Sequence, residues 1–193
     1  MRALVAFGTK HGSTREIAEA IAGELRMAGM TVDCLEASTV KAVSVYDLVV
    51  LGSAVYMKRW RAEAKRLLKR NRRELAAMPF WIFSSGPVGE KPAPPKWSEP
   101  AAVIRLAERI GVREHVVFGG HVPQDPGNFV ERAMLKNTPA EYQDLRDWDE
   151  IREWAARIAA SVMLSESDAG DRDGQPDEAL RNGPRDSGRI ALG

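Results

Sequence analysis

Hydroxyl side chains and a glycine are gathered in one short segment near the amino terminus, where residues 9–14 read TKHGST. The segment follows an apolar run at 1–7 and precedes a helical pattern that begins near Ser13. The amino end of a helix carries unpaired N–H groups and a partial positive charge, so it attracts anions. We therefore predict a loop that binds a terminal phosphate group, composed of Thr9, Lys10, His11, Gly12, Ser13 and Thr14.

Two common nucleotide-binding patterns are missing from the sequence, which narrows the ligand. There is no GxGxxG, so a dinucleotide pyrophosphate site is unsupported. There is no GxxxxGK[ST] either, so a nucleoside triphosphatase is also unsupported. The alternative interpretation of residues 9–14 is an ordinary polar turn in which Ser13 caps the next helix.

Short apolar runs alternate with helical patterns along the first 164 residues. The runs predict strands at 1–7, 31–35, 47–52, 80–83 and 115–118, and the patterns predict helices at 13–28, 60–75, 99–110 and 147–164. Such alternation is typical of a doubly wound α/β protein with three layers, α/β/α, and a five-stranded parallel sheet. We expect strand order 2-1-3-4-5, with the ligand at the carboxyl ends of the strands.

The remaining segments give a domain of residues 1–164 and a tail. Residues 121–139 predict an irregular excursion with a helical turn near 130–135, and Asp147 resembles the start of a capping box. Residues 165–193 have no aromatic side chain and are rich in Gly, Asp, Arg and Ser, which predicts a disordered tail.

Three further loops should meet the phosphate loop at the carboxyl edge of the sheet. The loop after the third strand offers an aromatic ring to a flat ligand and consists of Ser53, Ala54, Val55 and Tyr56. The loop after the fourth strand lets the backbone approach a ring closely and contains Ser85, Gly86, Pro87, Val88 and Gly89. For the first of these loops the alternative is that Tyr56 is only a partly buried tyrosine at a strand end. For the second it is that residues 85–89 are a plain Pro/Gly connector. In the fifth-strand loop, His121 is more typical of a structural histidine than of a ligand-binding one.

The TKHGST segment resembles the phosphate loop of flavodoxins, [ST]-x-[ST]-G-x-[ST], and departs from it at His11. The resemblance continues through STREIAEAIAGEL, YDLVVLGSAVY, the Met78–Pro79 pair and DWDEIREWAARIA, and covers about residues 1–163. These segments are similar to those of flavodoxin-type, menaquinone-dependent protoporphyrinogen dehydrogenases and their uncharacterised flavodoxin-domain relatives. The resemblance implies a flavodoxin-like fold and bound FMN.

The resemblance also implies a role for each loop. Residues 9–14 would hold the FMN phosphate, residues 53–56 one face and edge of the flavin ring, and residues 85–89 the other edge. We expect an FMN-dependent oxidoreductase that meets a redox partner or a small, quinone-like acceptor, with no side chain needed as catalyst. The dehydrogenases carry a long basic and aromatic insertion near the fifth strand, whereas residues 121–146 are short here, so the substrate stays unassigned. The alternatives are an electron-transfer carrier, although classical carriers are strongly acidic, and a flavin-free interaction module.

Charge and composition limit the partners. The formal net charge is +1, which gives no support for nucleic acid binding. Residues 58–73 carry nine basic residues against a single acid, Glu63, and predict a positive helix face. This face could meet an acidic protein, an anionic substrate or a membrane surface, and the alternative is a solvated face with no partner.

The single cysteine, Cys34, suits a reducing compartment and should be inert, and no metal site is expected. No apolar run is long enough to span a bilayer, so we expect a cytoplasmic protein, at most peripheral to a membrane.

Overall fold

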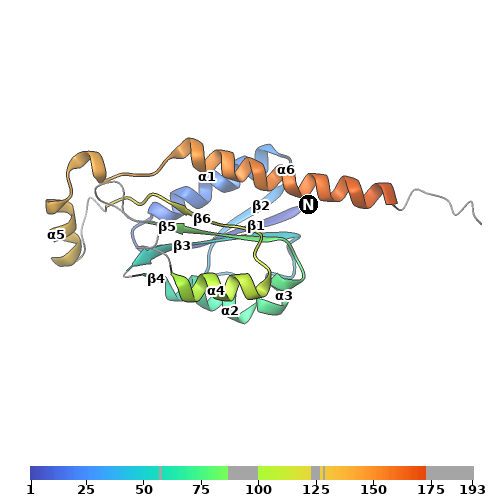
Figure 1. Ribbon diagram of the computed structural model, residues 1–193, viewed down its shortest axis with the longest axis horizontal. Coiled ribbons are helices and arrows are strands. Elements are labelled where there is room, and N and C mark those ends of the chain that lie inside the picture. The colour runs from blue at the N-terminus through green and yellow to red at the C-terminus, as the bar shows by residue number, and fades with distance from the viewer. Residues whose placement is uncertain (57, 87–99, 123–126, 128, 173–193) are drawn as a thin grey trace, which may run out of the picture.

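The computed structural model describes residues 1–56, 58–86, 100–122, 127 and 129–172 (Figure 1). The strands are β1 (Arg2–Gly8), β2 (Thr31–Glu36), β3 (Leu48–Tyr56), β4 (Arg59–Trp60), β5 (Phe80–Ser85) and β6 (His115–Phe118). The helices are α1 (Ser13–Met27), α2 (Ala62–Arg70), α3 (Arg72–Ala76), α4 (Ala101–Ile110), α5 (Phe129–Asn137) and α6 (Trp148–Arg172), with a 3-10 turn, η2, at Ala140–Tyr142.

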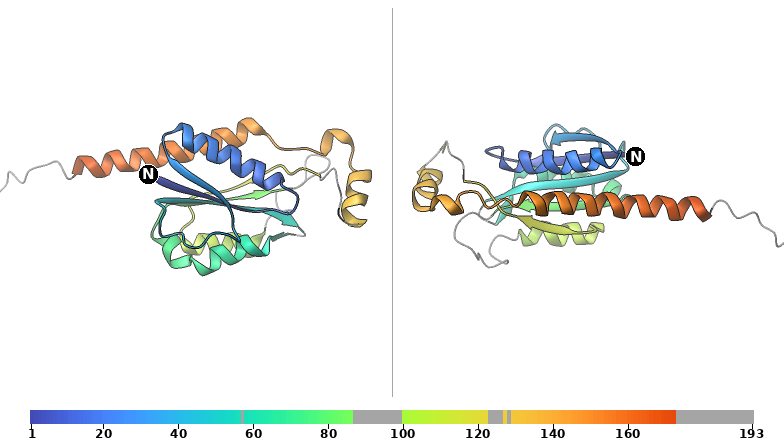
Figure 2. Two further views of the ribbon diagram at one scale, coloured as in Figure 1. Left: turned by 180° about the vertical axis from the view of Figure 1, so that it is seen from behind. Right: turned by 90° about the horizontal axis from the view of Figure 1, so that it is seen from above.

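The sheet has the predicted architecture. Its parallel strands are ordered β2-β1-β3-β5-β6, which is the expected 2-1-3-4-5 arrangement of five strands. The difference is an additional short strand, β4, that pairs antiparallel with β3. Figures 1 and 2 show α1 and α6 on one face of the sheet and α2, α3 and α4 on the other, so the three-layer prediction is confirmed.

Each face of the sheet has its own apolar core, as the continuous apolar centres of the strands require. On the α1–α6 face the rings of Phe83, Phe118 and Trp154 lie mutually 5.6–6.2 Å apart, measured between centroids. On the α2–α4 face, Leu67 and Leu68 of α2 pack with Phe80 of β5. Apolar positions three and four residues apart on the helices therefore pin them to the sheet.

The third strand and the helix after it differ from the prediction. β3 continues to Tyr56 and turns back into β4 through Lys58 at φ 61°. Residues 53–56 are therefore an extended strand rather than a loop, and Trp60 belongs to β4 rather than to a helix. Its indole Nε1 donates a hydrogen bond to Ser84 Oγ at 2.9 Å, which holds the hairpin against β5.

Helix boundaries were predicted with mixed success. The predicted helix at 60–75 is two helices separated at Asn71, whose side-chain amide donates to the Leu67 carbonyl. Asp147 caps α6 as predicted, because its Oδ1 accepts hydrogen bonds from the N–H groups of Asp149 and Glu150. The helical turn expected near 130–135 is the longer helix α5.

The last helix extends farther than the sequence indicates. We predicted an end near residue 164, followed by disorder, whereas α6 continues to Arg172. Residues 165–172 are helical, as the continuation of a helix that is capped at Asp147 and already nucleated. The rest of the predicted tail, 173–193, lies outside the described residues.

Gly52 shows how tightly the α1–α6 core is packed. A Cβ added to Gly52 would lie 1.9 Å from Cζ of Phe83, a fully buried ring held by Phe118 and Trp154. We expect Gly52→Ala to lower the free energy of unfolding by about 1–3 kcal/mol through overpacking. Gly23→Ala is the matched control, because its Cβ would meet nothing within 4 Å, and a helical alanine should be neutral or stabilising. Equal urea midpoints for the two variants would contradict this account.

Candidate functional site

The loop between β1 and α1 is shaped by Gly12. Gly12 precedes the helix in a left-handed conformation, with φ 90° and ψ −21°, which side chains rarely tolerate. Its N–H donates to Thr9 Oγ1 at 3.1 Å, closing the turn. The first helical hydrogen bond runs from Glu16 N to Gly12 O, so the N–H groups of residues 13–15 have no intrahelical acceptor.

Ser13 leaves a hydroxyl buried at this helix end. Gly12, not Ser13, occupies the N-cap position, and no side-chain cap is formed, so the interpretation of Ser13 as a cap is wrong. Ser13 Oγ is buried and has no hydrogen-bond partner within the described part of the chain. Burying an unpaired hydroxyl costs free energy, and a ligand with acceptor oxygens would remove that cost.

The end of β3 approaches the same loop. The ammonium of Lys10 lies 5.5 Å from the ring centroid of Tyr56, whose side chain is 37% exposed. Ser53 is fully buried, and its Oγ accepts a hydrogen bond from Arg61 N and donates to the Ala54 carbonyl, both at 2.9 Å. The structure therefore brings Lys10 and Tyr56 together, while the Ser53 hydroxyl has an internal structural role.

The end of β5 lies beside the end of β3. Ser85 is paired in register with Ala54, and Gly86 follows at φ 122° with its N–H bonded to the Phe118 carbonyl. At this positive φ glycine is the favoured residue. Pro87, Val88 and Gly89 lie outside the described residues.

Sequence reasoning missed two polar networks around this edge. In the first, Ser84 Oγ receives the Trp60 indole N–H and lies 3.0 Å from His115 Nε2, which ties β4, β5 and β6 together. Trp60 was assigned to a helix stripe and His115 to a plain strand, so neither residue gave a signal for this contact.

The second network centres on Arg146, which reaches α1 from the segment before α6. Its Nη1 lies 2.6 Å from Glu16 Oε2 and its Nη2 lies 2.6 Å from Asp144 Oδ2. Hydrogen bonding from Arg146 holds the pKa of Asp144 below its usual value. The backbone of His121 forms an isolated antiparallel β-bridge with Asp144.

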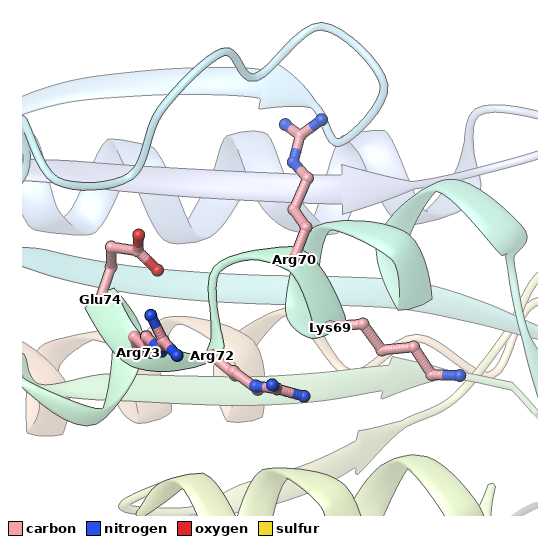
Figure 3. Close-up of a pocket in the computed structure, with 5 residues that line it drawn as sticks. All are labelled: Lys69, Arg70, Arg72, Arg73 and Glu74. Carbon is pink, nitrogen blue, oxygen red and sulfur yellow. The ribbon is translucent and has the colours of Figure 1, made fainter.

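A basic surface lies elsewhere, on α2 and α3. A hollow of about 390 Å³ is lined by Lys69, Arg70, Arg72, Arg73 and Glu74 (Figure 3). Arg70 points toward the segment between β2 and β3, where it donates to the Val40 carbonyl. The positive helix face predicted for residues 58–73 is thus present, with Leu67 and Leu68 buried beneath it.

Other chemistries find no support in the described ranges. These residues contain no group of three His, Cys, Asp or Glu side chains that could hold a metal ion. No described helix is long and apolar enough to cross a membrane.

A parallel sheet in the order β2-β1-β3-β5-β6 with helices on both faces is the flavodoxin-like arrangement of the doubly wound α/β class. A family model described as a flavodoxin domain matches residues 4–146, and the chain belongs to this family. Flavodoxin domains are flavoproteins whose cofactor is FMN, and they transfer electrons to redox partners.

Relatives and solved structures agree with this assignment. The chain is 24% identical over 172 residues to the protoporphyrinogen IX dehydrogenase [quinone] of Escherichia coli K12, which covers 82% of this chain and 95% of that protein. It resembles in fold an archaeal flavodoxin, with TM-score 0.55, 14% identity and coverage of 84% and 99%. A mutant flavodoxin from Pseudomonas aeruginosa gives TM-score 0.56, 16% identity and coverage of 83% and 97%.

The residues at the carboxyl edge fit FMN. The buried Ser13 hydroxyl and the free N–H groups of residues 13–15 are donors suited to a phosphate. Tyr56 supplies an aromatic surface at the adjacent strand end, and Gly86 leaves the backbone open beside it.

Cys34 provides a test of burial on the α1–α6 side. Burial, aided by the charge of Glu19, raises the pKa of its thiol to about 11. Because the thiolate is the reactive form, we expect alkylation by iodoacetamide at pH 8 to be roughly hundredfold slower in the folded protein than in urea. Mass spectrometry of the quenched samples measures both rates, and equal rates would contradict the burial of this thiol.

Proposed function

We propose that this chain is an FMN-dependent oxidoreductase with its cofactor at the carboxyl edge of the sheet. The observation that carries the proposal is the buried Ser13 hydroxyl at the amino end of α1, which has no hydrogen-bond partner among the described residues. We assign the phosphate to Thr9, Lys10, His11, Gly12, Ser13 and Thr14. We assign the ring to Ser53, Ala54, Val55 and Tyr56 on one side and to Ser85, Gly86, Pro87, Val88 and Gly89 on the other.

The protein groups would bind and orient the cofactor. The α1 N–H groups and the Ser13 hydroxyl would donate hydrogen bonds to the phosphate oxygens, and the helix dipole would favour their negative charge. Tyr56 would cover part of the ring and exclude water from it. FMN, once bound, would supply the electron or hydride transfer.

The acceptor is proposed to be a small, quinone-like molecule. The similarity to a dehydrogenase named for quinone supports this, since it extends over 95% of that protein. The near-neutral charge is also a poor match to strongly acidic carriers. The alternative, an electron carrier, is supported by the fold likeness to flavodoxins. Steady quinone reduction by the protein, given FMN and a reductant, would favour the enzyme.

Ser13→Ala tests the phosphate site. The hydroxyl makes no hydrogen bond to any residue that the structure describes, so the variant should unfold in urea as the parent does. A hydrogen bond to a charged group contributes about 1.5–3 kcal/mol, so the variant should bind FMN at least about tenfold more weakly. Quenching of FMN fluorescence measures the affinity.

Ser161→Ala is the matched control, because Ser161 lies on α6 and donates to the Ile158 carbonyl. It should leave FMN affinity unchanged. The assignment of the phosphate to α1 would fail if Ser13→Ala bound FMN as tightly as Ser161→Ala.

We further propose that the basic surface of α2 and α3 docks on an anionic membrane. Lys69, Arg72 and Arg73 are exposed and form no ion pair with any described residue. None of the exposed large apolar side chains in the described ranges lies on α2, α3 or α4. Stable protein interfaces rely on buried apolar anchors, whereas attraction to a lipid surface needs only cations. An acidic protein partner is the competing interpretation.

Co-sedimentation with lipid vesicles tests this surface. The parent protein should bind vesicles of phosphatidylcholine with phosphatidylglycerol and should not bind vesicles of phosphatidylcholine alone. At about 1 kcal/mol per cation, R72Q/R73Q should weaken binding roughly thirtyfold. The control R152Q/R157Q removes the same charge from the opposite face and should bind like the parent. No binding to anionic vesicles would exclude the membrane and favour a protein partner.

A further inference from the structure

The amino end of α1 contains a charge that opposes its proposed ligand. Glu16 lies in the first turn of the helix, and its N–H makes the first helical hydrogen bond to Gly12. A carboxylate here stabilises the helix through the macrodipole. The same carboxylate repels a phosphate group, which carries nearly two negative charges at neutral pH. A cation that offsets the charge of Glu16 would therefore favour phosphate binding at this helix end.

The basic residue next to Glu16 along the helix is already paired with another carboxylate. The Arg15 guanidinium lies 2.7 Å from Glu36 Oε1 at the end of β2 and 5.7 Å from the Phe7 ring centroid. Arg15 is therefore directed at β2, and the cation that contacts Glu16 comes from another part of the fold.

Arg146 supplies that compensation from a segment 130 residues away. Its Nη1 donates to Glu16 Oε2 at 2.6 Å, while Nε and Nη2 donate to the two oxygens of Asp144 at 2.8 and 2.6 Å. The guanidinium carbon lies 4.8 Å from the Trp148 ring centroid. The Arg146 side chain is only 7% exposed, whereas that of Glu16 is 54% exposed.

This geometry makes Arg146 a fixed cation rather than a loose surface partner. Asp144 and the Trp148 ring hold the planar guanidinium, which leaves Nη1 directed at Glu16. The charge of a buried arginine that is hydrogen-bonded to two carboxylates is less screened by solvent than the charge of an arginine in an exposed ion pair. The single charge of Arg146 is thus shared between Asp144 and Glu16, and at the first turn of α1 it partly offsets the Glu16 carboxylate before any ligand arrives.

We infer that Arg146 is a positioning residue for the cofactor: by offsetting the charge of Glu16, it favours binding of the FMN phosphate at the amino end of α1. The inference rests on the proposed FMN site. It places a requirement for phosphate binding on a residue just before α6, beyond the residues that the sequence assigned to the cofactor.

The test compares FMN with riboflavin, which has the same ring but no phosphate. Dissociation constants are measured by fluorescence quenching for the parent, R146Q, R146K, E16Q and E16Q/R146Q. We expect R146Q to weaken FMN binding by about tenfold, because the Glu16 carboxylate and the phosphate would repel each other across one helical turn. The affinity for riboflavin should not change. R146K keeps the charge and should retain most of the FMN affinity.

The double variant separates charge from structure. E16Q/R146Q should recover FMN affinity, because the repelling carboxylate is gone, although Arg146 is still missing. E16Q alone should tighten FMN binding a few-fold and leave the affinity for riboflavin unchanged. This variant still tests the inference if R146Q fails to fold. R152Q, which removes an exposed arginine from α6, is the control and should change neither ligand.

Two results would overturn the inference. One is an equal loss of FMN and riboflavin affinity in R146Q, which indicates a structural role alone. The other is a double variant that binds FMN no better than R146Q. Either differs from failure of the proposed function, in which the parent protein itself would not bind FMN.

Discussion

Apolar packing of α1 fixes the direction of its amino end, and the proposed chemistry depends on that direction. Ile17, Ile21 and Leu25 are fully buried on one stripe of the helix, in the same cluster as Val5 of β1 and Trp154 of α6. With the helix pinned along three turns, the N–H groups of its first turn point out at the carboxyl edge of the sheet. The loop from Gly8 to Gly12 therefore needs to supply only a turn, and Gly12 supplies it with a positive φ.

The two faces of the sheet differ in charge. The layer of α2, α3 and α4 presents exposed arginines and lysines, including Arg66, Lys69, Arg72 and Arg73. The layer of α1 and α6 carries both signs, arranged in pairs such as Arg152 with Asp149. A formal net charge of +1 thus conceals a one-sided distribution, and a one-sided cationic layer is the arrangement that an anionic surface would orient.

The sequence was sufficient to predict the parts of this fold that depend on local patterns. Buried parallel strands are continuous apolar runs, and helix ends are marked by Gly29, Gly111 and Asp147, so the order of elements could be read directly. The hairpin of β3 and β4 could not, because it depends on a tertiary hydrogen bond from Trp60 to Ser84. The Arg146–Glu16 pair was invisible for the same reason: the two residues meet only through the fold.

In the candidate site, too, some features follow from local sequence patterns and others depend on tertiary contacts. Residues 9–14 were predicted from the coincidence of hydroxyls, glycine and a helix start, and Gly12 and Ser13 have the expected placement at that helix end. The partners of the Ser53 hydroxyl, Arg61 N and the Ala54 carbonyl, could not be predicted from the local pattern. A polar residue type predicts that a hydrogen bond will form, but only packing determines with which partner.

The central claim is that the carboxyl edge of this sheet binds FMN, and the visible absorption spectrum of the purified protein with added FMN tests it most directly. Binding in a site that excludes water should perturb the fine structure of the flavin bands, and the change should saturate at one FMN per chain. A spectrum identical to that of free FMN, at micromolar protein and excess FMN, would contradict the claim and leave a flavin-free interaction module on a flavodoxin fold.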